Sequence, residues 1–166
     1  MVTDVNEAPT SVTFSNAISS INEIPDNGVS DSASATAASI KLADINVADD
    51  SIGFNTLSLT GADANSFEIA GDELRLKAGT VLDFESKPRF DIVVQVDDAT
   101  MGNTPDALAN FGLDVVDLNE APNTLALQNP VVNLDENADT TERLKLAEIT
   151  FLDDALGANI LSVSGR

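Results

Sequence analysis

Apolar and polar residues alternate with a period of two along much of this 166-residue chain. Neighbouring side chains of a β-strand point to opposite faces, so this alternation predicts strands. It is clearest in IKLADINV (40–47), LSLTG (57–61), FEIAGDELRLK (67–77), FDIVVQV (90–96) and FGLDVV (111–116). Gly71 and Asp72 predict the turn of a hairpin within the third segment. The segments together predict an all-β antiparallel sandwich of about seven strands with Greek-key connections, and only residues 139–149 are also compatible with a helix.

The sequence repeats itself at a long interval. DVNEAP, which begins at Asp4, returns as DLNEAP beginning at Asp117, and Glu23 is matched by Glu136; both offsets are 113 residues. KLADINVADDSIGFNTLSLTG (41–61) returns as KLAEITFLDDALGANILSVSG, at an offset of 104 residues. The difference between the offsets means that nine residues of the first copy have no counterpart in the second, between Glu136 and Lys145.

The nine extra residues of the first copy fall in a Ser/Ala-rich stretch, residues 26–39, whose composition is typical of a surface loop. We expect a linker at residues 1–9, a complete repeat at 10–116, a second linker at 117–122 and the N-terminal part of a second repeat at 123–166. This organisation is typical of tandem-repeat proteins. Because a partial sandwich cannot close its own core, the chain is expected to be a piece of a longer array.

The chain carries 28 acidic and 8 basic residues, for a net charge of -20. So few cations cannot neutralise phosphates, which excludes nucleic acid and anionic membrane surfaces as partners. No apolar run approaches the length of a transmembrane helix, so membrane insertion is not predicted. The acidity has two interpretations, bound calcium or adaptation to salty water. The sequence has no Cys and no His, which excludes disulfide bonds and catalysis that uses either residue.

Five short motifs follow one another along the first repeat. They are Glu23, DDSIGFN (49–55), LDFE (82–85), VDD (96–98) and the linker DLNEAP (117–122). With these residues in this order the chain resembles the cadherin repeat, in the divergent form of large bacterial surface proteins. The resemblance implies an immunoglobulin-like, cadherin-like Greek-key sandwich located at the cell surface or outside the cell. It also implies a structural and adhesive role, no enzymatic activity, and calcium ions at the joints between consecutive repeats.

The same resemblance implies which residues would bind calcium. Two ions at the second linker would share Glu23, Asp83, Glu85, Asp117 and Glu120. A third ion would rest on Asn119 and Asp153. The matching third ion of a preceding joint would be held by Asn6, Asp49, Asn55 and Asp98. Ser51 and Ala155 stand where the family has a further Asp, which weakens both of these third-ion sites.

The chemistry of the residues supports calcium independently of the resemblance. Calcium prefers about six to eight hard oxygen ligands. Asp83 and Glu85 are two positions apart and would share one face of an extended segment. Asp117 and Glu120 lie on a linker that a proline ends. Carboxylates crowded in this way repel one another, and bound calcium would convert the repulsion into shared coordination that stiffens the array.

Single motifs also have simpler interpretations. Asp83 and Glu85 could be the carboxylate pair of a glycosidase, although no aromatic platform for a sugar accompanies them. Asp97-Asp98 and Asp153-Asp154 could each be solvated turn residues. The recurrence of an Asp-Asp pair with Gly and Asn at fixed spacing favours a shared purpose over this simpler interpretation.

Neighbouring repeats of the same chain are the main partners that we expect. One alternative function is a carbohydrate-binding module that takes a cell-surface polysaccharide. An aromatic content of only 4%, all of it Phe, argues against a sugar site. The other alternative is homophilic adhesion to a second copy of the chain by strand exchange, through residues 1–8 or through the incomplete second repeat.

Overall fold

The computed structural model describes residues 1, 3–24, 35–50, 52–102, 104–122, 124–154 and 156–165. Most of the Ser/Ala-rich stretch lies outside the described residues, and so do Ser51 and Ala155, the two departures from the calcium motif. The described residues fall into two compact units. Unit 1 extends to Asp117, and unit 2 begins at Leu118.

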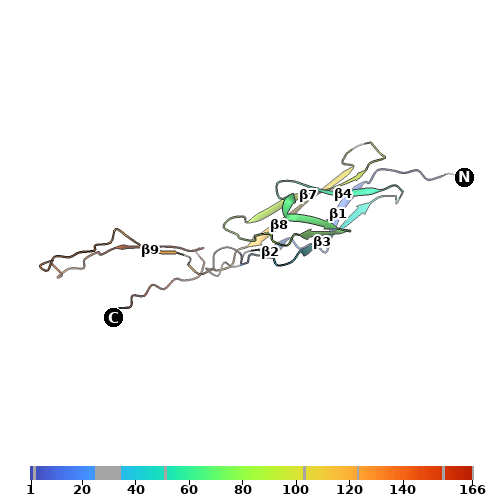
Figure 1. Cartoon of the computed structure of the whole chain (residues 1–166). Coiled ribbons are helices and arrows are strands. Elements are labelled where there is room, and N and C mark those ends of the chain that lie inside the picture. The colour runs from blue at the N-terminus through green and yellow to red at the C-terminus, as the bar shows by residue number, and fades with distance from the viewer. Residues whose placement is uncertain are drawn as a thin grey trace. The chain divides into compact units, whose positions relative to one another are not determined.

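Unit 1 contains two four-stranded sheets (Figure 1). The first sheet is antiparallel and has the order β1 (Ser11–Ser15), β3 (Ile40–Ala48), β6 (Glu73–Leu76), β5 (Phe67–Ala70). The second has the order β2 (Ser20–Asn22), β8 (Ala107–Val116), β7 (Arg89–Asp98), β4 (Asn55–Thr60). In it β2 pairs with β8 in parallel, and the other pairs are antiparallel. A 3-10 helix, η1 (Ala64–Ser66), precedes β5, and the described residues include no helix that is long and apolar enough to cross a membrane.

The predicted all-β sandwich is confirmed. The hairpin between β5 and β6 turns at Gly71 and Asp72, as predicted, with Ala70 opposite Glu73 and a positive φ at Gly71. The alternation did not predict β1 and β2, which join different sheets, β1 the first and β2 the second. β8 begins four residues before the predicted segment, because Ala107–Asn110 continue the ladder with β7.

The core of unit 1 consists of the alternate apolar residues of both sheets. Its fully buried members include Leu42, Leu74, Val94, Val96 and Leu113. Phe rings from opposite sheets meet edge to face, with centroids 5.2 Å apart in one pair and 6.0 Å apart in the other. Because buried apolar surface contributes roughly 25 cal/mol per Å², this core is the main source of the stability of unit 1.

Unit 2 repeats the first strand pair of unit 1. β9 (Thr124–Gln128) and β10 (Glu148–Leu152) are antiparallel, and Thr124 pairs with Leu152 as Ser11 pairs with Ala48 in unit 1. The offsets are 113 residues for β9 and 104 for β10, the same as in the sequence. Residues 139–149, which were also compatible with a helix, form none and contribute to β10. The internal repeat is therefore structural.

The two copies differ in what covers their apolar faces. Leu42 of β3 is fully buried, whereas its counterpart Leu146 is 49% exposed. Val12 of β1 is 5% exposed and its counterpart Leu125 is 68% exposed. The described residues of unit 2 include no strand that corresponds to β7 or β8, which bury these positions in unit 1.

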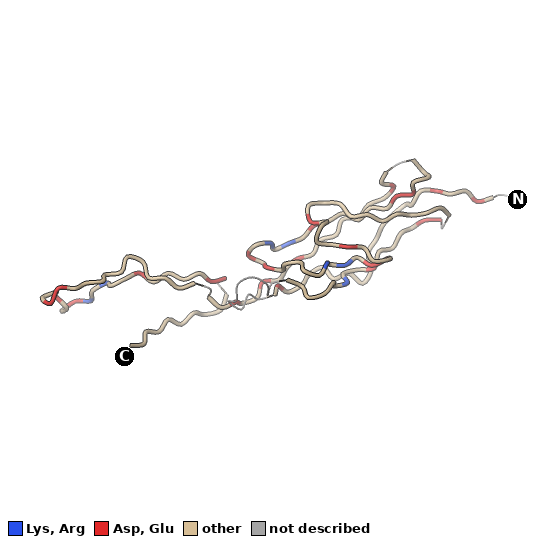
Figure 2. The backbone as a smooth tube through the Cα atoms, in the orientation of Figure 1, with Lys and Arg blue, Asp and Glu red and all other residues tan. Residues whose placement is uncertain are grey.

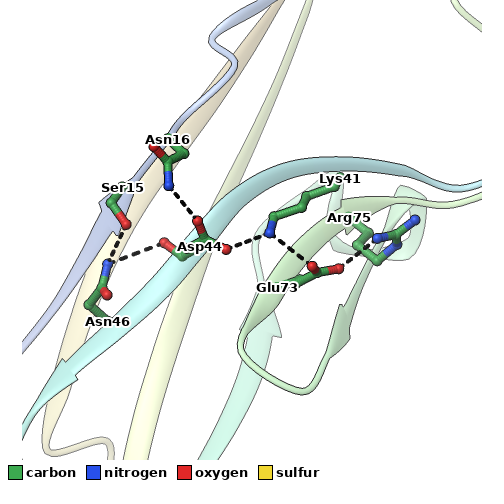
Figure 3. Close-up of polar contacts among 7 residues, drawn as sticks. All are labelled: Ser15, Asn16, Lys41, Asp44, Asn46, Glu73 and Arg75. Atoms are coloured by element: carbon green, nitrogen blue, oxygen red, sulfur yellow. Dashed lines mark hydrogen bonds and ion pairs between the residues drawn. The ribbon is translucent and has the colours of Figure 1, made fainter.

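A chain of ion pairs crosses the outer face of the first sheet of unit 1 (Figure 3). Nζ of Lys41 lies 2.6 Å from Oδ1 of Asp44 and 2.8 Å from Oε1 of Glu73. The other carboxylate oxygen of Glu73 lies 2.6 Å from a guanidinium nitrogen of Arg75. These contacts connect β3 with β6 on the face opposite the core.

Candidate metal centre

Asn6 docks the N-terminal linker onto the end of unit 1 where β7 finishes. Its Nδ2 donates to Oδ2 of Asp98 at 2.9 Å and to Oγ1 of Thr100 at 2.8 Å. Asp98 is 1% exposed, and its Oδ1 accepts the N–H and the hydroxyl of Thr100. The hydrogen bonds from Asn6 and Thr100 hold the pKa of Asp98 below its usual range. A buried carboxylate is therefore kept ionised at this end of the sandwich.

Asp49 and Asn55 lie at the same end, Asp49 directly after β3 and Asn55 at the start of β4. Nδ2 of Asn55 donates to Oδ2 of Asp49 at 2.7 Å. Oδ1 of Asp49 and Oδ1 of Asn6 are buried and have no hydrogen-bond partner among the described residues. Gly53 leaves room beside them, because a Cβ there would lie 2.3 Å from Oδ1 of Asn6. Buried oxygens are normally hydrogen-bonded or coordinated, so these two can be satisfied by water or a cation from outside the chain.

Unit 2 reproduces this arrangement at the second linker. Nδ2 of Asn159 donates to Oδ2 of Asp153 at 2.6 Å, as Asn55 does to Asp49. Oδ1 of Asp153 is buried and has no hydrogen-bond partner within the described part of the chain. A Cβ at Gly157 would lie 2.1 Å from Oδ1 of Asn119. The repeated sequence motif therefore folds into a repeated set of oxygens.

Three further carboxylates of unit 1 converge near the start of β7. Glu23, Asp83 and Glu85 each offer one oxygen, and these oxygens all lie within 4.8 Å of one another. Glu23 follows β2, is 3% exposed, and accepts the N–H of Phe84 at Oε2 over 2.8 Å. Oδ1 of Asp83 accepts the N–H of Ser86 at 3.0 Å. Parts of the chain about 60 residues apart thus bring three negative charges together.

The surroundings of Glu85 raise its pKa above the ordinary value. Desolvation raises the pKa of Glu85, and the negative charges of Glu23, Asp117 and Asp83 raise it further. The backbone N–H of Glu85 opposes this effect. The folded chain therefore disfavours the ionised form of Glu85 unless a positive charge is close.

The prediction that Asp83 and Glu85 lie on an extended segment is wrong. Residues 84–86 form a turn, in which the N–H of Lys87 donates to the carbonyl of Asp83 at 2.8 Å. Asp is favoured at such positions because its side chain accepts N–H groups of the following residues. The turn, and not the alternation of a strand, places the two carboxylates on one side.

The predicted residues form separate groups. One group in unit 1 lies near the start of β7 and consists of Glu23, Asp83 and Glu85. The charge of Asp117 is close enough to raise the pKa of Glu85. Asn6, Asp49, Asn55 and Asp98 lie where β7 ends. In unit 2, the predicted residues are Asn119, Glu120 and Asp153.

Sequence reasoning missed several residues that complete the N-terminal end of unit 1. Thr100 holds both Asn6 and Asp98, and Oδ2 of Asp106 accepts the N–H of Asp98 at 2.7 Å. Nothing in the sequence distinguishes either residue from an ordinary loop residue. Asp50 was also missed, although the second copy of the repeat has an Asp, Asp154, at the matching position, which was a usable signal.

The basic residues of unit 1 lie away from this end. Figure 2 shows acidic residues on the N-terminal linker and on the loops beside it, whereas the Lys and Arg residues of the described part of unit 1 lie along the body of the sandwich. Those cations are engaged elsewhere, as in the pairs Lys41–Asp44 and Lys87–Asp63. Among the described residues, no cationic side chain therefore pairs with the carboxylates at the end of unit 1 that carries the N-terminal linker.

The fold is similar to that of cadherin extracellular domains. Among solved structures, the chain is similar to protocadherin gamma B2 extracellular cadherin domains 1–5, with a TM-score of 0.59 and 18% identity over 91% of this chain and 27% of that one. It is also similar to the protocadherin gammaB7 EC3-6 cis-dimer structure, with a TM-score of 0.54 and 19% identity over 86% of this chain and 32% of that one. The chain thus spans about a third or less of the length of these structures.

No protein-family model matches the chain. No curated protein matches it either. At identities below 20% the structural neighbours establish the architecture, and the residues of the chain itself must carry any conclusion about function.

Proposed function

We propose that this chain is a calcium-binding structural and adhesive module of a tandem-repeat protein that a bacterium displays on its surface or secretes. The convergence of Glu23, Asp83 and Glu85 carries the proposal. Oxygens that bind one calcium ion at about 2.3–2.6 Å can lie no more than about 5 Å apart, so a spread of 4.8 Å fits a single ion. All three donors are carboxylate oxygens, the hard ligands that calcium prefers.

Buried oxygens at the linkers add support. Oδ1 atoms of Asn6, Asp49 and Asp153 have no hydrogen-bond partner among the described residues, and an unsatisfied buried acceptor costs about 1–3 kcal/mol. A cation would supply the missing partner. The ligand candidates at these places are Asn6, Asp49, Asn55 and Asp98 in unit 1, and Asn119 and Asp153 in unit 2.

The proposed role of the ion is mechanical. Calcium would convert repulsion among carboxylates into coordination, and would thereby stiffen the joints between consecutive repeats. In this organisation residues 1–9 and 117–122 are linkers, 10–116 is a complete repeat, and 123–166 begins the next. The module is non-enzymatic and works outside the cell, where calcium modules typically have dissociation constants of about 0.1–1 mM.

Association with a second copy of the chain is the other candidate function. Unit 2 exposes apolar side chains that favour a partner; they include Leu125, Leu127, Ile149 and Phe151. One of the similar solved structures is described as a cis-dimer. Polysaccharide binding has less support, because the exposed Phe side chains among the described residues are only Phe54 and Phe151.

Isothermal titration calorimetry with calcium tests the proposal. We expect the parent chain to bind calcium and Glu85→Gln to weaken binding by tenfold or more, since the variant loses one charged ligand. Glu68→Gln removes a carboxylate from β5, outside the cluster, and should bind as the parent does. Equal binding by parent and Glu85→Gln, or no binding to the parent, would refute the calcium role. Light scattering at several protein concentrations tests self-association.

A further inference from the structure

Two Asp-Asp pairs, Asp49-Asp50 and Asp153-Asp154, are copies of each other in the repeat, and in both the second Asp is bonded differently from the first. In unit 1, Oδ2 of Asp50 accepts the backbone N–H of Glu7 at 3.1 Å. Oδ1 of Asp50 accepts the backbone N–H of Ile52 at 2.8 Å. One carboxylate thereby joins the N-terminal linker to the loop that follows β3.

Unit 2 contains the same two bonds. Oδ2 of Asp154 accepts the backbone N–H of Glu120 at 2.8 Å, and Oδ1 accepts the backbone N–H of Leu156 at 2.9 Å. The linker positions are 113 residues apart in the two units and the Asp positions are 104 apart, which matches the sequence repeat. The contact therefore occurs twice in one chain, in two units that differ in their number of described strands.

The first Asp of each pair keeps a free oxygen. Asp49 and Asp153 each receive an Asn side chain at Oδ2. Their Oδ1 atoms are buried and have no hydrogen-bond partner in the described parts of the chain. In the second Asp both oxygens accept backbone N–H groups, and charge-assisted bonds of this kind are among the stronger hydrogen bonds in proteins.

We propose that the two Asp residues have divided roles: Asp50 and Asp154 are metal-independent anchors that fasten each linker to its repeat, whereas Asp49 and Asp153 face the ion. The anchors are positioning residues. They hold the linker backbone where Asn6 and Asn119 lie against Gly53 and Gly157, so the ligands are assembled before an ion arrives. The ligand half of this assignment rests on the proposed function. The anchor half does not, because its hydrogen bonds require no ion.

An anchored linker has a measurable consequence in the absence of calcium. The amides of Glu7 and Ile52 should exchange slowly with solvent even in EDTA, since both are hydrogen-bonded to Asp50. Asp50→Ala should speed exchange at both amides by tenfold or more, as expected for loss of a bond to a charged acceptor. Asp49→Ala, the matched control, should leave both amides protected.

Amide exchange followed by NMR on the whole chain, in EDTA and then in calcium, separates the possible outcomes. Unchanged exchange of the Glu7 and Ile52 amides in Asp50→Ala overturns the anchor, and faster exchange in Asp49→Ala overturns the division of roles. Val94 and Leu113, in the core strands, report whether the variant is folded. If Asp50→Ala unfolds, Asp50→Asn keeps one acceptor oxygen and should protect one of the two amides.

Calcium affinity provides the second measurement. Asp49→Ala should abolish binding at this end of unit 1, whereas Asp50→Ala should weaken it several-fold without removing a ligand. If the parent binds no calcium, the proposed function fails while the exchange data still decide the anchor. Asp154→Ala and Asp153→Ala repeat the comparison in unit 2, at the amides of Glu120 and Leu156.

Discussion

A Cβ atom at Gly53 would lie 2.3 Å from Oδ1 of Asn6, so this glycine determines how closely the linker approaches unit 1. The same Cβ would lie 2.4 Å from Oδ2 of Asp98, and Gly53 has a φ of +87°. We expect Gly53→Ala to displace Asn6 from Asp98 and to lower the free energy of unfolding by roughly 1–3 kcal/mol. Chemical denaturation of parent and variant measures this cost.

Gly79 supplies the matched control for that substitution. It has a φ of +81°, and a Cβ there would meet nothing within 4 Å. Gly79→Ala therefore carries similar backbone strain without the collision. If the two variants lost the same free energy of unfolding, the close approach of Asn6 to Gly53 would make no contribution to stability.

The ion pairs of Figure 3 predict a pH-dependent contribution to stability. Hydrogen bonds from Asn16 and Lys41 lower the pKa of Asp44, and those from Lys41 and Arg75 lower the pKa of Glu73. Lowered pKa values stabilise the folded chain above the ordinary values of 3.8 and 4.5, and this contribution is lost as pH falls through the lowered values. Lys41→Gln should therefore lower Tm at pH 7, with a difference from the parent that vanishes in acid.

Lys77→Gln is the control for the charge of Lys41. Lys77 donates to the backbone carbonyl of Asn65 instead of pairing with Asp44 or Glu73. The difference in Tm between Lys77→Gln and the parent should therefore be the same at pH 7 and in acid. A difference for Lys41→Gln that persisted unchanged at pH 3 would show that the ion pairs are irrelevant to stability, since both carboxylates are then largely protonated in the unfolded chain.

The two copies of the repeat predict unequal costs for one substitution. Leu42 is fully buried and Leu146, its counterpart, is 49% exposed. Leu42→Ala should lower the free energy of unfolding by about 2–5 kcal/mol, whereas Leu146→Ala should change it by roughly 0.5 kcal/mol or less. Urea denaturation compares the two. Equal costs would mean that Leu146 is buried in solution, by a second copy or by other means.

Much of the fold could be predicted from alternation alone. Each segment of period two in unit 1 became a strand, because one face of each sheet is buried and the other meets water. The short strand β2 could not be predicted, since it is three residues long and carries one apolar residue, Ile21. The turn at residues 84–86 was missed because Asp and Glu at alternate positions also suit a strand.

The candidate site was predictable only in part. Asp49, Asn55 and Asp98 were proposed from the residue types and order of the motif, and the structure brings them to one end of unit 1. Thr100 and Asp106 were missed because they act through hydrogen bonds to Asp98 that only the folded loop creates. The role of Asp50 depends on which atoms fill its carboxylate, which no residue pattern specifies.

We expect calcium bound by Glu23, Asp83 and Glu85 to stabilise unit 1. Thermal unfolding in EDTA, in calcium and in magnesium at equal concentration measures this stabilisation. At roughly a hundredfold excess over the dissociation constant, one calcium site contributes about 2.7 kcal/mol. We predict a rise in Tm of several degrees in calcium, smaller in magnesium, and largely lost in Glu85→Gln. An unchanged Tm in calcium, or an equal rise in Glu85→Gln, would contradict the account.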